Sequence, residues 1–392
     1  APGPADSPAP PAVLRVAVGE PLSLDPGKAY DSDSAFFQIQ LFEGLVTIDQ
    51  DQNVLPAIAA RWEVAEGGSK YLFYLCQGAR WSDGTPLTAA QFEYAWKRNL
   101  NPATQAPAAH LLYAVRNARA YREGKMDNPD FIGVKALDEH TLEVCLEGPT
   151  AYLPYLLADP ITFPLPRWAI QAQGPAWSTP GNMVTNGPYT LLAWQRGERL
   201  VLERNPCYAG RFPGNAHRVE CRIFTDHKLG VEAYAANDLD VADMISGEAG
   251  VMAQIRAVHG EELIFTPRLS TNYLIFSADR GPFSDVRVRQ AFSHAVDREA
   301  LIRELMHEQY LPATGGVVPP GMPGHSPDIG LAYDPDLARR LLAEAGYPGG
   351  KGFPGVAFLH THGLGDESFL PLLQRAWFRN LGVDVEVITL AW

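Results

Sequence analysis

The chain has 392 residues, of which 46% are hydrophobic, and it carries a formal net charge of −13 at pH 7. This length predicts two or three domains with sizeable cores. The negative charge argues against nucleic acid and anionic membrane surfaces as partners, because both would repel it, and it fits a protein that accepts cationic ligands. No apolar run approaches the roughly 20 residues that span a bilayer.

The first twelve residues differ in composition from the rest. Five prolines stand among Ala, Gly and Ser before residue 12, which predicts a Pro-rich linker over 1–12. No signal peptide is visible, so we expect a mature or shortened chain. Such a linker fits an exported protein that is anchored at its N-terminus, and it fits equally a connection from an upstream domain.

The first predicted elements are a strand, a loop and a helix. Residues 13–18 alternate as a strand does. A polar loop is expected over 28–34 and a helix over 36–45, with Gly44 as the residue that ends it. Further on, 71–75 is a strong strand, and Thr88 is expected to cap a helix over 89–98.

The middle of the chain predicts hairpins and a crossing segment. A first hairpin is expected to turn at Asp138–His140. The Pro- and aromatic-rich stretch 151–166 is expected to cross between lobes. A second hairpin follows over 186–206, then a strand over 219–224 and a helix over 231–240, which together suit a parallel α/β layer.

The stretch 271–305 is expected to form a strand and two capped helices. Residues 272–276 are aromatic and aliphatic, as in a strand. Asp285 and Asp297 stand where an N-cap accepts a hydrogen bond from a free amide of the first turn. After it we expect a helix over 336–345, a strand over 356–359, a loop over 360–366, a helix to Asn380 and a strand over 383–388.

The four cysteines leave two alternatives open. They are Cys76, Cys145, Cys207 and Cys221. No CxxC pair occurs, so a zinc or redox motif is not expected. Either Cys76 pairs with Cys145 and Cys207 with Cys221 across neighbouring strands, or all four are small buried apolar residues.

No catalytic or metal-binding arrangement is found. His360 and His362 could face one side of an extended loop, but two ligands are too few for a metal site. No Gly-x-Ser-x-Gly string or phosphate loop occurs. We therefore expect no cofactor, no metal and no enzyme activity.

Several strings resemble one family. Residues 282–292 (PFSDVRVRQAF), followed by AVDR at 295–298, resemble the signature helix of the solute-binding proteins of peptide-type ABC importers. Within that family the resemblance is greatest to the oligopeptide-binding proteins. Further matching strings are LDP at 24–26, FEGL at 42–45, WSDGTPLTA at 81–89, NGPY at 186–189 and NPCY at 205–208.

The resemblance implies an α/β, periplasmic-binding-protein-like fold of type II, in the three-lobed variant of peptide binders. Lobe I would comprise 13–46 and 161–268, lobe II would be inserted over 47–160, and lobe III would cover 269–392. Family members continue beyond this point, so lobe III is expected to be incomplete. The Asp that captures the ligand's ammonium in oligopeptide binders has no counterpart here, and Ser277 replaces the family's Asn.

The function implied is extracytoplasmic capture of oligopeptides in a cleft between lobes and their delivery to the membrane subunits of an ABC importer, by a monomer. The residues expected to line the cleft are Tyr30, Asp31, Ser32, Asn186, Gly187, Asn272, Tyr273, His360 and His362. The alternatives are the ligand-sensing domain of a signalling protein and a binder of another solute, such as a sugar, nickel or haem.

Overall fold

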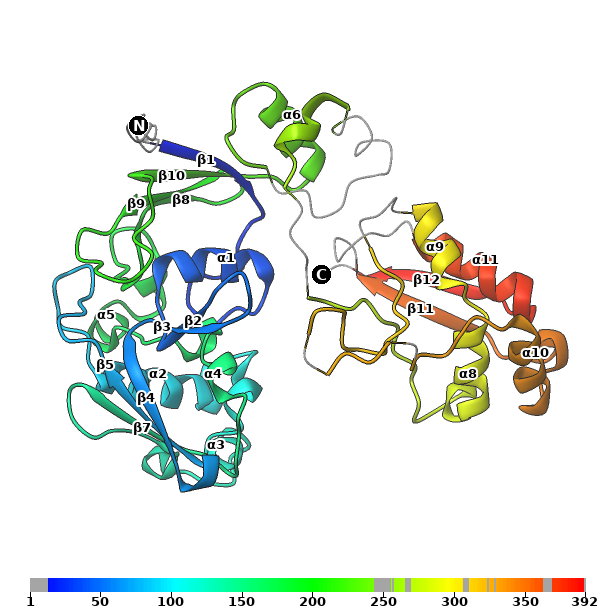
Figure 1. The fold of residues 1–392 in the computed structure, drawn as a ribbon, viewed down its shortest axis with the longest axis horizontal. Helices are drawn as coiled ribbons and strands as arrows, with labels where there is room; N and C mark the ends of the chain where they lie inside the picture. Colours follow the sequence, from blue (N-terminus) through cyan, green and yellow to red (C-terminus); the bar gives the residue numbers. More distant parts are fainter. Residues whose placement is uncertain are drawn as a thin grey trace, which may run out of the picture. The chain divides into compact units, whose positions relative to one another are not determined.

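The computed structural model describes residues 13–242, 255, 257–264, 269–305, 310–322, 324–327, 329–361 and 369–390. The chain divides into two compact units, Ala1–Asp243 and Met244–Trp392, shown in Figure 1. Each unit has its own apolar core. No helix in the described part of the chain is long and apolar enough to span a membrane.

The first sheet of unit 1 joins strands from distant parts of the sequence. Its order is β1 (Val13–Val18), β10 (Arg218–Ile223), β9 (Arg199–Arg204) and β8 (Tyr189–Gln195). β1 runs parallel to β10 and lies beside it in Figure 1. The expected second hairpin is confirmed, because β8 pairs antiparallel with β9. β9 and β10 also pair antiparallel, since β8, β9 and β10 follow one another in the chain.

The second sheet of unit 1 is antiparallel throughout. Its order is β4 (Ala59–Ala65), β5 (Lys70–Leu75), β7 (Thr141–Cys145) and β6 (Val134–Ala136). Helix α2 (Ala89–Leu100) packs on β6 and β7. The predicted capping role of Thr88 is confirmed, since it forms a capping box with Gln91.

The two sheets share one core. A single cluster of buried apolar side chains runs from Phe37 and Leu41 near the first sheet to Phe73 and Trp96 at the second. The six tryptophans of unit 1 all belong to this cluster or pack against it. Unit 1 is therefore one packed body.

Helix α1 (Ser32–Leu41) begins earlier than the sequence pattern predicts. Asp31 is its N-cap and accepts a hydrogen bond from the Ser34 amide at 2.8 Å. The predicted role of Gly44 is wrong, because the helix ends at Leu41. Gly44 instead allows close packing, since a Cβ there would lie 2.6 Å from the Phe163 ring.

The remaining elements of unit 1 are short. The β2–β3 ribbon pairs Val46–Ile48 with Val54–Pro56. The helices are α3 (Ala118–Arg122), α4 (Leu153–Leu156), α5 (Arg167–Gln173) and α6 (His227–Ala235). The 3-10 turns of both units are η1 (Glu66–Gly68), η2 (Pro102–Thr104), η3 (Ala109–Leu112), η4 (Pro129–Phe131), η5 (Pro160–Thr162), η6 (Gly174–Ser178), η7 (Gly260–Glu262), η8 (Pro282–Ser284) and η9 (Pro348–Gly350).

Unit 2 packs helices against a parallel pair of strands. The pair is β11 (Val356–Thr361) and β12 (Val385–Leu390). The helices are α8 (Val286–His294), α9 (Arg298–Leu305), α10 (Pro335–Glu344) and α11 (Phe369–Leu381). Both predicted caps are confirmed: Asp285 accepts from the Arg287 amide at 2.8 Å and Asp297 from the Ala300 amide at 2.9 Å.

The strand predicted over 272–276 is wrong. Among the described residues this segment has no strand partner, and a strand needs a neighbour for its ladder. The alternation that motivated the prediction is real. Leu274 and Phe276 pack against the core of unit 2, while Tyr273 and Ile275 are exposed.

All four cysteines are free thiols. β5 and β7 are neighbours as expected, but Cys145 pairs with Lys70 at one end of β5 and Cys76 follows the other end. Cys221 lies inside β10, whereas Cys207 lies beyond the end of β9. Strand register thus keeps the members of each expected pair apart. The alternative of four buried residues holds for Cys221 alone, because the other three are partly exposed.

Candidate ligand-binding site

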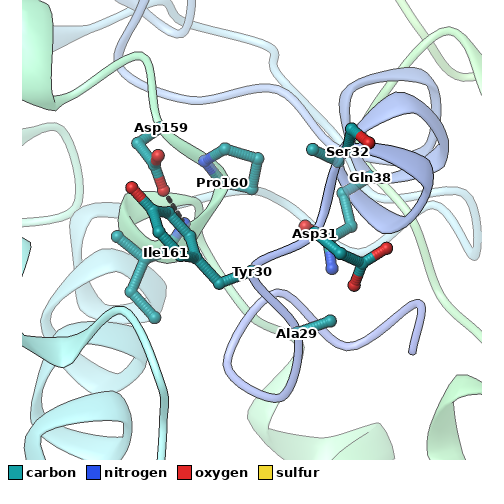
Figure 2. Close-up of a pocket in the computed structure, with 9 residues that line it drawn as sticks. Ala29, Tyr30, Asp31, Ser32, Gln38, Asp159, Pro160 and Ile161 are labelled. Carbon is teal, nitrogen blue, oxygen red and sulfur yellow. Dashed lines mark hydrogen bonds between the residues drawn. The ribbon is translucent and has the colours of Figure 1, made fainter. Parts of the chain in front are cut away.

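A pocket of about 210 Å³ in unit 1 brings together two segments that are far apart in the sequence. One runs from Ala29 into the first turns of α1, and the other is Asp159 with the start of η5. Figure 2 shows Tyr30 and Asp159 on one side and Asp31 and Ser32 on the other. The full lining is Ala29, Tyr30, Asp31, Ser32, Ala35, Gln38, Asp159, Pro160 and Ile161. Three predicted residues, Tyr30, Asp31 and Ser32, therefore meet in one place.

Asp31 has one carboxylate oxygen committed to the fold and one that is not. The first oxygen caps α1. The second is buried and has no hydrogen-bond partner among the described residues. A buried acceptor without a donor is costly, so this oxygen leaves a negative charge beside the pocket that the described residues do not pair through a hydrogen bond.

Asp159 occupies the opposite wall of the pocket. One of its oxygens accepts a hydrogen bond from the Ile161 amide at 3.0 Å and so caps η5. Burial raises the pKa of Asp159, and the nearby His110 lowers it by a smaller amount. Its negative charge is therefore only partly compensated by the described protein groups.

Tyr30 is the exposed aromatic residue of the pocket, with 57% of its surface accessible. Its ring meets that of His110 edge to face, with the centroids 6.1 Å apart. Burial and the carboxylate of Asp159 both raise the pKa of the Tyr30 hydroxyl. The phenol is accordingly a neutral hydrogen-bonding group.

The loop before the pocket is fixed by a buried ion pair. Asp25 is 3% exposed and accepts from Arg98 of α2 at 2.6 and 3.0 Å. Trp177 and the Gly27 amide donate to the same carboxylate, at 3.1 and 2.9 Å. These contacts position the chain that continues into Tyr30.

Part of the backbone at the pocket lacks hydrogen-bond partners among the described residues. Asp31 has an extended conformation, with φ −115° and ψ 160°. Among the described residues, no backbone amide or carbonyl of Ala29 or Tyr30 takes part in a hydrogen bond. Ala29 is nevertheless 5% exposed. Buried backbone groups are nearly always paired, so an extended ligand main chain would complete this segment.

Asn186 and Gly187 lie behind α1 and not in the pocket lining. Asn186 is 2% exposed, and its side chain clamps the backbone of Glu43 with contacts of 2.9 and 3.3 Å. The Gly187 amide donates to Leu41 at 2.9 Å. A Cβ at Gly187 would lie 2.6 Å from the backbone of Leu41 and Phe42. These contacts of Asn186 and Gly187 with residues 41–43 form a joint behind α1. The joint supports the helix whose first turns line the pocket.

Glu43 is a buried carboxyl in the same joint. The Tyr208 hydroxyl donates to one of its oxygens at 2.7 Å, while the other oxygen is buried without a hydrogen bond from the described residues. Burial raises the pKa of Glu43, and the Tyr208 hydrogen bond opposes this in part.

The other predicted residues belong to unit 2. Asn272 and Tyr273 are exposed, Tyr273 with 65% of its surface. His360 was expected in a loop but lies inside β11, where it is 7% exposed. His362 and the rest of that predicted loop lie outside the described residues. No group of three or more His, Cys, Asp or Glu able to hold a metal occurs in the described part of the chain.

Sequence reasoning missed the second wall of the pocket. Asp159, Pro160 and Ile161 lie in a stretch without helical or strand periodicity. The one available signal was Asp followed by Pro, which is an N-cap with proline in the first turn. That signal predicts a turn but does not reveal that the turn packs beside Tyr30.

Comparison with known proteins decides the family. The model of the bacterial extracellular solute-binding proteins, family 5 (Middle), matches residues 53–392. The chain belongs to this family. Family 5 is a family of solute-binding proteins and not of enzymes, and it is described as extracellular.

Two relatives from Escherichia coli (strain K12) match nearly all of this family-5 chain. The probable deoxycholate-binding periplasmic protein YgiS is 35% identical over 95% of this chain and 70% of its own length. The periplasmic oligopeptide-binding protein OppA is 34% identical over 94% of this chain and 69% of its own.

A solved structure confirms the fold class. The murein tripeptide binding protein MppA of Escherichia coli superimposes with a TM-score of 0.85, at 28% identity, over 98% of this chain and 76% of its own. The predicted α/β, periplasmic-binding-protein-like fold of type II is confirmed, as is the resemblance to the oligopeptide-binding branch of family 5.

Proposed function

We propose that this family-5 protein captures oligopeptides outside the cytoplasm and delivers them to an ABC importer. Support comes from two similar proteins whose names describe binding of oligopeptides and of a murein tripeptide. The observation that carries the proposal is the segment beside the pocket, where Asp31 is extended and, among the described residues, the backbone groups of Ala29 and Tyr30 have no backbone hydrogen bond. Pairing of a peptide main chain with such a segment gives affinity that depends little on side chains.

The pocket also distinguishes between the two ligand classes named for the relatives. Deoxycholate is an anion at neutral pH, and two of the lining residues, Asp31 and Asp159, are acidic. Like charges at short range disfavour binding. A peptide backbone with an ammonium terminus or basic side chains meets no such repulsion, so the peptide is the ligand class that we propose.

The proposal includes the assembly and the fate of the ligand. We propose a monomer, periplasmic or held at the cell surface by a lipid anchor, that releases its ligand chemically unchanged to the importer's membrane subunits. We retain the three-lobe division 13–46 with 161–268, 47–160 and 269–392 as part of the same proposal. The sensing alternative has no structural observation in its favour.

Thermal unfolding with and without ligand tests the function. Peptides of two to eight residues are expected to raise the unfolding midpoint, because a ligand that binds only the native state stabilises it by RT ln(1 + [L]/Kd). Deoxycholate at equal concentration is expected to have no effect. A midpoint raised by deoxycholate and by none of the peptides would overturn the proposal. Mass spectrometry of the recovered peptide checks that it is unaltered.

Two tyrosine variants test the predicted contacts. Tyr30→Ala is expected to weaken peptide binding about tenfold without lowering stability, because the side chain is largely exposed. Tyr273→Ala tests separately whether unit 2 touches the ligand. Phe131→Ala is the matched control, since Phe131 is 62% exposed in unit 1 and lies outside the pocket lining. Unchanged affinity in both tyrosine variants would remove these residues from the site.

A further inference from the structure

The pocket has an imbalance of charge. Of the nine described residues that line it, two are acidic and none is basic. The ion pairs found among the described residues do not include Asp31 or Asp159. Arg98, the largely buried cation near this loop, forms an ion pair with Asp25. Among the described residues that line the pocket, none therefore supplies a positive charge to balance Asp31 and Asp159.

The two carboxylates, Asp31 and Asp159, differ in how they can interact with a ligand. Asp31 caps α1 with one oxygen, and its other oxygen is buried. Asp159 caps η5 with one oxygen and stands beside the exposed ring of Tyr30, as Figure 2 shows. A side chain that enters along the Tyr30 ring therefore meets Asp159.

The shape and lining suit a long side chain that ends in a cation. Ala29, Pro160 and Ile161 provide apolar surface for an aliphatic stem. Tyr30 adds an aromatic face, against which cations pack favourably. The cavity volume of about 210 Å³ is large enough to admit one such side chain.

We propose that this pocket binds the lysine or arginine side chain of a peptide and that Asp159 is the residue that sets this preference. The inference rests on the proposed peptide-binding function and names a ligand class within it. The contact is a charge-assisted hydrogen bond from an ammonium or guanidinium group to the Asp159 carboxylate. Asp31 contributes negative potential from the opposite wall.

The test compares peptides that differ by one charge. Trialanine peptides with a single lysine at position 1, 2 or 3 are paired with peptides that carry norleucine at the same position, which keeps the stem and removes the ammonium. Isothermal titration calorimetry of the whole chain gives the two dissociation constants. At one position at least, lysine is expected to bind about tenfold or more tightly than norleucine, as a charged hydrogen bond predicts.

Two variants assign the preference to Asp159. Asp159→Asn keeps the cap on Ile161, because an amide oxygen still accepts that hydrogen bond, and it is expected to reduce the lysine preference to about threefold or less. Asp159→Glu is expected to retain most of the preference. Asp51→Asn, in the exposed turn between β2 and β3, changes the net charge equally and is expected to leave the preference intact.

The outcomes separate the two proposals. If neither peptide series binds, the proposed peptide-binding function is wrong and this inference is wrong with it. If both series bind with equal affinity at all three positions, the function stands and the inference fails. If Asp159→Asn retains the full lysine preference, Asp159 does not set it.

Discussion

Neutralising Asp25 is expected to destabilise unit 1 strongly. Asp25→Asn keeps the oxygen that accepts from Gly27 and from one nitrogen of Arg98. It places an amide NH2 group against the other Arg98 nitrogen and the Trp177 indole, which are both donors. The variant loses two hydrogen bonds to the ionised carboxylate, and it leaves a largely buried guanidinium without its counter-charge. The expected loss is about 3–5 kcal/mol.

Urea unfolding followed by far-UV circular dichroism measures this loss. Glu63→Gln is the control, because the Arg61–Glu63 pair is exposed, with 59% and 52% of the side chains accessible, and such pairs contribute at most about 1 kcal/mol. In a double-mutant cycle with Arg98→Met, we expect a coupling energy above about 1.5 kcal/mol. A loss in Asp25→Asn no larger than that of the control would refute the reasoning.

Two further predictions concern the joint behind α1. Burial raises the pKa of Glu43 above its unfolded value, so this carboxyl favours the fold at low pH and the benefit disappears as pH rises through the folded pKa. Glu43→Gln is therefore expected to raise the unfolding midpoint at pH 8 by about 2–4 °C and to have little effect at pH 4, and a shift that is equal at both pH values would contradict this. Gly187→Ala is expected to cost about 1–3 kcal/mol, because its Cβ would lie 2.6 Å from the backbone of α1. Gly148→Ala, where a Cβ meets nothing within 4 Å, is the control, and equal stability of the two variants in urea unfolding would show that the close approach does not matter.

Local chemistry explains what the sequence predicted correctly. Thr88, Asp285 and Asp297 cap helices through hydrogen bonds to residues two or three positions away. Such contacts depend only on residues that are close together in the sequence. The hairpin turned at Asp138–His140 is likewise local, since β6 and β7 are joined directly.

The failures depend on contacts between distant residues. The segment 272–276 has the alternation of a strand, but alternation does not specify a ladder partner. Gly44 follows a helix in the sequence, but its role is to leave room for the ring of Phe163, which is distant in the sequence. The pocket was half predicted for the same reason: Tyr30 lies in a recognisable string, whereas Asp159 reaches it only through the packing of η5 beside α1.

The pairing of β1 with β10 has a consequence for how the protein is made. Val13 pairs with Arg218, so β1 has no partner in this sheet until most of unit 1 has been translated. At about 5–20 residues per second this interval is about 10–40 s. During that time β1 stays without its strand partner, so the first sheet of unit 1 closes only after β10 has been made.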